Sequence, residues 1–191
     1  MDWSELQSRI YHFAKKAFAE LHDKCPNEEF YAFALYTDSS AMGIGPSANS
    51  IERLNEKIQS ELEGEDETPE NAAYYKWASS EWAYEAVGGE FFKGINKDLS
   101  ESAERADFKA FKDKVLQAMT DALDDMVKER FFDSLCKKAG KAVVFVSMTD
   151  DDESENIENA SARAINPQAI YEAFLGRYDV VNEPQERQDV R

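Results

Sequence analysis

The sequence FYAFALY at residues 30–36 constrains the fold more than any other segment, because it leaves neither side of a strand polar. A strand that is apolar on both faces is typical of a central position in a sheet that is covered on both sides. The turn-forming sequence TDSS follows at 37–40, and residues 41–45 are expected to return as a second strand that ends at Pro46. The sequence therefore predicts a β-hairpin over residues 29–46.

Helical periodicity dominates the rest of the chain. Apolar residues recur at steps of three and four in segments that begin near capping residues or end near Pro and Gly. Between the last two of these segments lies the β-branched run VVFV at 143–146, which is the clearest strand of the chain. The predicted helices are 2–24, 50–62, 71–78, 91–99, 104–139 and 167–176.

An early hairpin and a late strand among longer helices predict an α+β fold, with a small, mostly antiparallel sheet covered by helices. The length of 191 residues suits one domain. We expect this domain to span residues 1–181. A polar C-terminal tail is expected at 182–191, because that segment lacks an apolar pattern.

The charge of the chain narrows the choice of partners. The 39 Asp and Glu residues outnumber the 22 Lys and Arg residues, which leaves a net charge of -17 at pH 7. Binding to phosphates requires clustered Lys and Arg, so nucleic acids and anionic membrane surfaces are not expected as partners. A basic protein partner is compatible with this charge, and so is a role of the charge in solubility alone.

The sequence also predicts the compartment. No apolar run approaches the roughly 20 residues that a membrane span needs, and the N-terminus lacks the basic-then-apolar pattern of a signal peptide. The two cysteines, Cys25 and Cys136, lie far apart and belong to no CxxC pair. Together these features predict a cytoplasmic protein with reduced thiols.

The acid surplus is partly local. Segments 61–70 and 150–158 each contain six acidic residues and no Lys or Arg, and both are expected to be loops. In the second segment, Asp150 and Asp152 are candidate metal ligands, because a hard cation needs several converging oxygens. The EF-hand pattern is not met there, so a solvated loop is the simpler interpretation and no metal is predicted.

Residues 74–85 form the most distinctive segment, with five aromatic side chains in twelve positions. Rings with a polar tip are over-represented at interfaces, but they also close hydrophobic cores. We expect these rings mainly to cover the edge of the sheet, and the alternative is a surface for a partner or ligand. In that alternative the contacting residues are Trp77, Glu81, Trp82, Tyr84 and, from the hairpin turn, Asp38.

The sequence contains no recognisable catalytic or cofactor-binding motif. His12 and His22 lie on one predicted helix, about 80° and nearly three turns apart, so they cannot bind one metal together. The segment 42–46 contains two glycines but lacks the lysine of a phosphate-binding loop. We therefore predict no catalytic residue and no cofactor, and we favour a protein that is not an enzyme.

Four sequence elements together resemble one known family. They are residues 30–54, the sequence KWASSEWAYE at 76–85, the F-x-x-x-I-N-x-x-L pattern at 91–99 and the sequence VVFVSMTDDD at 143–152. In this order they resemble the bacterial family catalogued as domain of unknown function 4303. The resemblance implies a compact cytosolic α+β domain, and it implies no catalytic residues. Families of this kind are similar to small immunity-type proteins encoded beside bacterial toxins, which is an analogy only.

Two functions follow as hypotheses. The first is a protein-interaction module of the immunity type, which binds a basic partner through the carboxylates of 61–70 and 150–158 and through exposed rings of 74–84. The alternative is a small-ligand-binding protein or an enzyme, with a pocket between the hairpin and residues 77–84. The polar groups of that pocket are expected to include Asp38, Glu81 and Asp150.

Overall fold

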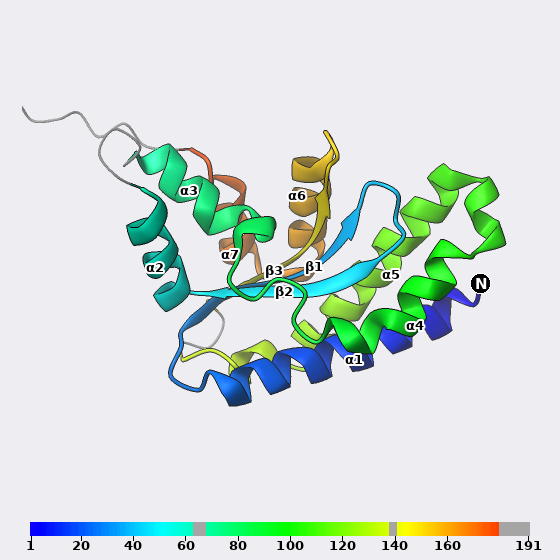
Figure 1. Ribbon diagram of the computed structural model, residues 1–191, viewed down its shortest axis with the longest axis horizontal. Helices are drawn as coiled ribbons and strands as arrows, with labels where there is room; N and C mark the ends of the chain where they lie inside the picture. The colour runs from blue at the N-terminus through cyan, green and yellow to red at the C-terminus, as the bar shows by residue number, and fades with distance from the viewer. Residues whose placement is uncertain (63–67, 138–140, 180–191) are drawn as a thin grey trace, which may run out of the picture.

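The computed structural model describes residues 1–62, 68–137 and 141–179. These residues form a three-stranded sheet with helices on both of its faces, which confirms the predicted α+β class (Figure 1). The predicted tail at 182–191 and residues 63–67 of the predicted acidic loop lie outside the described residues. Among the helices described, none has both the length and the apolar character that crossing a membrane requires.

The sheet has β1 (Phe30–Asp38) in its centre, with β2 (Ile44–Ser50) on one side and β3 (Val143–Thr149) on the other. β1 and β2 are the strands of the predicted hairpin and run antiparallel, whereas β3 runs parallel to β1. The sheet is therefore mixed, with one antiparallel and one parallel pair in the described chain. The central position predicted for residues 30–36 is confirmed.

β2 extends beyond the predicted end of the hairpin, because Pro46 lies inside the strand. Pro46 pairs with Leu35 of β1, and its carbonyl accepts a hydrogen bond from the Val87 amide at 3.1 Å. Proline is tolerated in an edge strand, where its missing N–H is not needed by a neighbouring strand. The strand continues to Ser50, whose hydroxyl accepts from the Arg53 amide and caps the next helix.

Six of the described α-helices correspond to helices that the sequence predicts, and the sequence does not predict α6 (Ser154–Ile165). Three short 3₁₀ helices also lie within the described residues. In the described chain the α-helices are α1 (Trp3–Lys24), α2 (Ile51–Glu61), α3 (Pro69–Trp77), α4 (Gly89–Ser100), α5 (Phe108–Lys128), α6 (Ser154–Ile165) and α7 (Gln168–Leu175). The 3₁₀ helices are η2 (Ser79–Glu81), η3 (Ala103–Ala106) and η4 (Phe132–Ser134).

The helix predicted over 104–139 is shorter than expected. α5 ends at Lys128, and Arg130 adopts a φ of 59°. A residue in this left-handed conformation commonly terminates a helix. The apolar residues that continue the pattern belong instead to η4 and its neighbours, where Phe132 is buried in the core.

The predicted acidic loop at 150–158 contains the first turn of a helix. α6 begins at Ser154. In the turn that precedes it, the Asp151 carboxylate accepts a hydrogen bond from the Glu153 amide at 2.9 Å. The loop prediction is wrong for residues 154–158. The sequence does not indicate a helix there because half of the buried face is polar, which leaves only a weak apolar periodicity. That face consists of Glu158, Ser161, Ala162 and Ile165.

The two faces of the sheet carry different layers (Figure 1). α1, α4 and α5 cover one face, where Val144 belongs to a large apolar core. On the other face, Phe145 packs against the rings of Trp82 and Phe174. Neighbouring residues of β3 thus contribute to opposite cores, as expected for a strand that is apolar on both faces.

Asparagine side chains satisfy backbone groups at both edges of the sheet, and at the β2 edge the backbone of Tyr84 and Val87 pairs with others. At the β3 edge, the Asn166 side chain accepts from the Val144 amide at 2.9 Å and donates to the Val144 carbonyl at 2.6 Å. At the β2 edge, Asn96 accepts from the Ile44 amide at 2.8 Å and donates to the Ile44 carbonyl at 3.2 Å. Each asparagine takes the place of a neighbouring strand, so these backbone groups are not available to another chain.

We expect Asn166→Ala to lower the free energy of unfolding by about 1–3 kcal/mol, because the amide and carbonyl of Val144 lose their partners at a partly buried edge. Urea unfolding measures this difference. Asn55→Ala, on the exposed side of α2, is the matched control and should stay within about 0.5 kcal/mol of the unchanged protein. Equal stability of the two variants would contradict the role given to Asn166.

Candidate functional site

Described residues line an open pocket of ≈ 390 Å³ at the carboxyl end of β3. This volume lies within the range of roughly 300–1,000 Å³ that is usual for ligand sites. Most of the lining residues carry hydroxyl or carboxyl groups, and we call this site the carboxylate pocket. Its lining consists of Tyr74, Ser79, Ser80, Ser147, Thr149, Asp150, Ser154, Glu155, Glu158 and Tyr178, with Ala78 and Met148 between them.

The end of β3 and the start of α6 form one wall of the carboxylate pocket. Asp150 adopts a φ of 57°, a left-handed conformation that Asp tolerates better than most residues. The chain turns there from the strand toward α6, so Ser154 and Glu155 of the first helical turn lie at the pocket with Asp150. The strand supplies Ser147 and Thr149, which are two residues apart and therefore point to the same face of the sheet.

The opposite wall is the segment 78–80, which a buried ring holds in place. Trp82 is only 3% exposed. Its indole donates to the Lys76 carbonyl at 3.0 Å, and its ring packs edge-on against Phe145 at a centroid distance of 5.7 Å. The predicted aromatic segment therefore positions one wall of the pocket mainly through a ring in the core.

A buried hydrogen-bond chain forms the floor of the pocket. Ser79 Oγ donates to Ser147 Oγ at 3.0 Å, and Ser147 Oγ donates to Glu158 Oε1 at 2.8 Å. The other oxygen of Glu158 accepts from Arg177 at 2.9 Å, and Arg177 also donates to Asn159 at 2.6 Å. Burial raises the pKa of Glu158 above its ordinary value, although the hydrogen bond from Ser147 and the charge of Arg177 act in the opposite direction.

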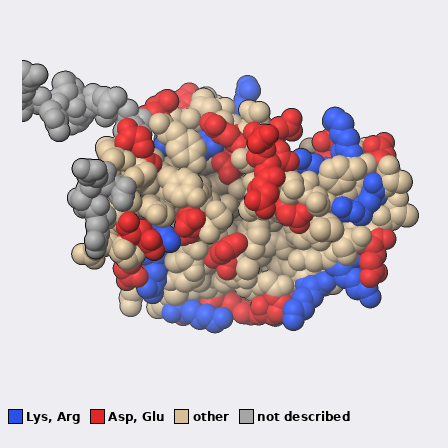
Figure 2. Space-filling view, turned by 45° about the horizontal axis from the view of Figure 1, so that its top comes forward, with Lys and Arg blue, Asp and Glu red and all other residues tan. Residues whose placement is uncertain are grey.

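The accessible side of the pocket is acidic. Asp150 and Glu155 add two carboxylates to that of Glu158, and no Lys or Arg of the described chain lines the pocket. Figure 2 shows Asp and Glu side chains gathered over the β3–α6 turn on this face of the molecule. Tyr74 and Tyr178, which are 49% and 44% exposed, add aromatic surface to the lining. Such a site suits a cation that donates hydrogen bonds and disfavours an anion.

The sequence predicts three polar residues for a pocket, and of these Asp150 lines the carboxylate pocket. Asp38 ends β1 and accepts from the Ser40 amide of its own turn at 2.8 Å. Glu81 forms an ion pair with Lys57 at 3.3 Å. The carboxylate pocket does lie beside the aromatic segment, but its other wall is the β3–α6 turn and not the hairpin.

Two further rings predicted as contact residues, Trp77 and Tyr84, are half-buried. Trp77 packs against Phe174 at a centroid distance of 5.4 Å, and the Tyr84 hydroxyl donates to Glu28 at 2.7 Å. Trp77 and Tyr84 therefore make contacts within the protein, as expected of rings that cover the sheet. The exposed aromatic surface that this segment supplies to the pocket comes from Tyr74.

The candidate metal ligands do not converge. Asp152 is exposed, whereas Asp150 lines the carboxylate pocket. Asp151 between them is paired with Lys112 at 2.5 Å. Across residues 1–62, 68–137 and 141–179, no group of three or more His, Cys, Asp or Glu is arranged to hold a metal ion.

Sequence reasoning missed the floor of the pocket. Ser147 did offer a signal, since a serine in an otherwise apolar strand needs a hydrogen-bond partner. Glu158 offered a weaker one, because it lies in a segment so acidic that a single buried carboxyl does not stand out. Tyr178 follows the last predicted helix and belongs to no pattern.

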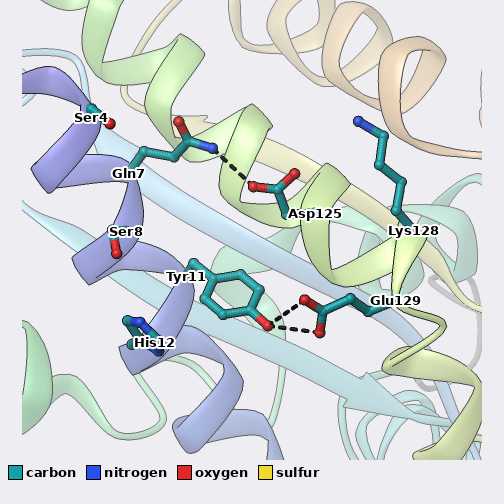
Figure 3. A pocket seen from close by; sticks show the side chains of 8 residues that line it. All are labelled: Ser4, Gln7, Ser8, Tyr11, His12, Asp125, Lys128 and Glu129. Carbon is teal, nitrogen blue, oxygen red and sulfur yellow. Dashed lines mark hydrogen bonds between the residues drawn. The ribbon is translucent and has the colours of Figure 1, made fainter.

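A larger hollow of ≈ 450 Å³ lies between α1 and α5 (Figure 3). Several of its polar groups are bound to each other across the two helices. Gln7 donates to Asp125 at 3.0 Å, and the Tyr11 hydroxyl donates to Glu129 at 2.7 Å. Because these contacts join the helices, we interpret the hollow as a polar seam between them and not as a binding site.

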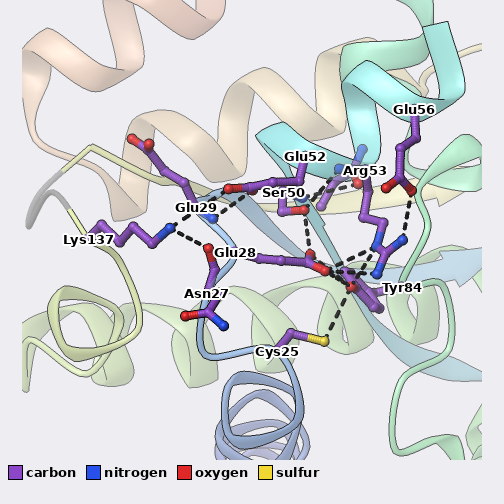
Figure 4. Close-up of polar contacts among 11 residues, drawn as sticks. Cys25, Asn27, Glu28, Glu29, Ser50, Glu52, Arg53, Glu56, Tyr84 and Lys137 are labelled. Carbon is purple, nitrogen blue, oxygen red and sulfur yellow. Dashed lines mark hydrogen bonds and ion pairs between the residues drawn. The ribbon is translucent and has the colours of Figure 1, made fainter. Parts of the chain in front are cut away.

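A second polar cluster joins the start of β1 to α2 (Figure 4). Glu28 accepts from the Tyr84 hydroxyl at 2.7 Å, from the Ser50 hydroxyl at 2.6 Å and from the Arg53 guanidinium at 3.0 Å. The Cys25 sulfur lies 3.3 Å from the Tyr84 oxygen. Burial raises the pKa of Tyr84, so its hydroxyl stays protonated and continues to donate. The groups are used within the cluster, which indicates a structural role.

The fold and the pocket define a small α+β domain with a mixed sheet and an anionic pocket. The family described as Domain of unknown function (DUF4303) matches residues 10–167, and the chain belongs to this family. The match confirms the resemblance seen in the sequence. It includes the pocket residues from Tyr74 to Glu158, whereas Arg177 and Tyr178 lie beyond it. The comparisons with curated proteins and with solved structures found no match.

Arg177→Met should lower the free energy of unfolding by about 3–5 kcal/mol above neutral pH, because it leaves Glu158 charged and buried without its cation. The loss should shrink on acidification. The pKa of Glu158 in the folded protein lies above its ordinary value, so its carboxyl costs stability above that pKa, and the cost disappears as the pH falls through it. Urea unfolding at about pH 5.5 and about pH 8 measures both effects.

Arg163→Met, on the exposed side of α6, is the matched control for this variant. It should change the free energy of unfolding by less than about 0.5 kcal/mol at either pH. If the loss for Arg177→Met were the same at both pH values, the pairing of Arg177 with a buried Glu158 carboxylate would be refuted.

Proposed function

We propose that this protein is an interaction module that binds a basic partner protein and receives one of its Arg or Lys side chains in the carboxylate pocket. One observation carries the proposal, namely the chemistry of the lining. Among the described residues, the lining combines two exposed carboxyl groups, Asp150 and Glu155, with several hydroxyls and two exposed tyrosines, and it includes no basic side chain. The third carboxyl group, that of Glu158, is buried and paired with Arg177. A cationic side chain matches this lining, and an anionic one does not.

An arginine side chain fits the pocket through its hydrogen-bonding groups. The guanidinium carries five N–H donors and no acceptor. Asp150, Glu155 and Thr149 supply side-chain oxygens that can accept those bonds. Tyr74 and Tyr178 can stack on the guanidinium plane, which contributes about 0.5–1 kcal/mol at an exposed site.

The net charge supports the same kind of partner. A charge of -17 attracts basic molecules and raises their association rate, to an extent that decreases with salt. Isolated surface ion pairs contribute only about 0–1 kcal/mol each. We therefore expect the charge of the whole surface to set the association rate and the orientation of the partner. The pocket is expected to provide most of the affinity.

The bacterial and cytoplasmic setting belongs to the same proposal. Cys25 and Cys136 are both free cysteines, which is usual in a reducing compartment. An immunity-type role, in which the partner is a basic toxin domain, is supported by the analogy between families of this kind and such proteins.

A small-ligand-binding function is the second candidate, and the size of the pocket favours it. A pocket of ≈ 390 Å³ has room for a small organic cation such as a polyamine. In that case a free organic cation would bind the pocket as tightly as a peptide that carries the same cationic group.

A peptide with one central arginine among Gly and Ser residues tests the proposal against the same peptide with citrulline, the uncharged analogue of arginine. We expect the arginine peptide to bind at least tenfold more tightly, which corresponds to about 1.4 kcal/mol. Its affinity should also decrease with salt. Isothermal titration calorimetry measures both effects.

Asp150→Asn removes one pocket charge at a backbone position that Asn tolerates equally well, and it should weaken arginine-peptide binding by about fivefold to tenfold. Asp23→Asn, at the end of α1, is the matched control for net charge and should leave the affinity unchanged at physiological salt. Equal binding of the arginine and citrulline peptides would rule out the proposal. Binding of spermidine as tight as that of the peptide would favour the second candidate.

A further inference from the structure

A second pocket lies on the same face of the sheet, at the opposite end of β3. It measures ≈ 400 Å³, and we call it the apolar groove. Its walls are rings and alkyl groups, chiefly those of Tyr31, Trp77, Val143, Ile170 and Phe174. Val143 is the first residue of β3, whereas the carboxylate pocket is lined by the last residues of that strand.

The charged side chains of the apolar groove are two lysines. Lys76 and Lys141 line the groove, and no Asp or Glu of the described chain does. The Lys76 ammonium lies 4.8 Å from the centre of the Trp77 ring, at the apolar wall. Within the described chain, neither lysine has a carboxylate at ion-pair distance. Among the residues that the structure describes, the charged groups of this groove are therefore cationic, in contrast to a chain whose net charge is -17.

We propose that the apolar groove binds a small organic carboxylate with an alkyl or aryl body. The body is buried against Trp77, Ile170 and Phe174, where it leaves water for an apolar surface. The carboxylate pairs with the ammonium groups of Lys76 and Lys141. A volume of ≈ 400 Å³ is within the usual size of small-ligand sites.

The surrounding charge favours a small anion over a macromolecule. An acidic protein or an anionic membrane would bring many negative charges close to a surface that is itself negative, and repulsion would oppose docking. A small carboxylate brings one charge close to two lysines. Salt screens the repulsion from carboxylates more than about 8 Å away at physiological ionic strength. The attraction of the ligand to the two lysines is therefore expected to outweigh that repulsion.

The proposal does not rest on the carboxylate pocket, because the two sites share no lining residue. The absence of arginine-peptide binding would therefore leave it unaffected. The two sites also require ligands of opposite charge, which keeps their tests distinct.

Decanoate is the probe, added to the full chain below the concentration at which it forms micelles, and isothermal titration calorimetry measures its binding. We expect Lys76→Gln and Lys141→Gln each to weaken binding by about threefold to tenfold. Lys93→Gln, on an exposed position of α4, is the matched control and should leave the affinity unchanged. Decyltrimethylammonium has the same chain length with a cationic head, and it should bind at least about tenfold more weakly.

Ala173→Leu tests the apolar wall, because Ala173 lines the groove from an exposed position on α7. It should reduce decanoate affinity while the thermal midpoint stays close to that of Ala164→Leu, an exposed change on α6. Equal affinity for decanoate and decyltrimethylammonium would overturn the proposal. So would equal affinities of Lys76→Gln and Lys93→Gln, or no measurable binding of decanoate at about millimolar concentration.

Discussion

The hydrogen bonds that close the two edges of the sheet are the constraint on which the rest of the structure depends. In the described residues the sheet has three strands, so two of the three lie at an edge and have backbone groups that no neighbouring strand pairs. At β2, the backbone of Tyr84 and Val87 satisfies some of these groups. Asn96 and Asn166 satisfy such groups with side-chain amides from α4 and from the end of α6. Because each amide must reach one backbone position, the two contacts also fix where α4 and α6 lie against the sheet.

The position of α6 in turn creates the floor of the carboxylate pocket. Ser161 Oγ accepts from the Val146 amide at 2.9 Å, which sets the register of α6 along β3. Glu158 lies three residues earlier on the same helix face and therefore reaches Ser147. Arg177, which follows α7, balances the charge of this buried carboxylate. The contacts that protect the strand edge thus also place a titratable group beneath the pocket.

The sequence predicts the parts of this arrangement that depend on local pattern. Residues 30–36 predict a central strand because burial on both faces requires apolar residues at every position. Ser47, Asn49 and Ser50 predict a helix start because their side chains can cap the amides that follow. The parallel pairing of β3 with β1 and the burial of Glu158 depend on contacts between distant segments, which no local pattern encodes. The aromatic segment is intermediate, because amphipathic rings suit a core and an interface equally, and packing places Trp82 in the core.

Two pockets of opposite charge lie on one face of the sheet, and a basic partner is expected to bind at the anionic one. The most direct test is to record the backbone amide chemical shifts of the isotopically labelled full chain while the arginine peptide is titrated. The predicted result is a saturable set of changes confined to 78–80, 147–158 and 177–178, which is lost in high salt. Changes spread evenly over the acidic surface, or concentrated between α1 and α5, would contradict the role proposed for the carboxylate pocket.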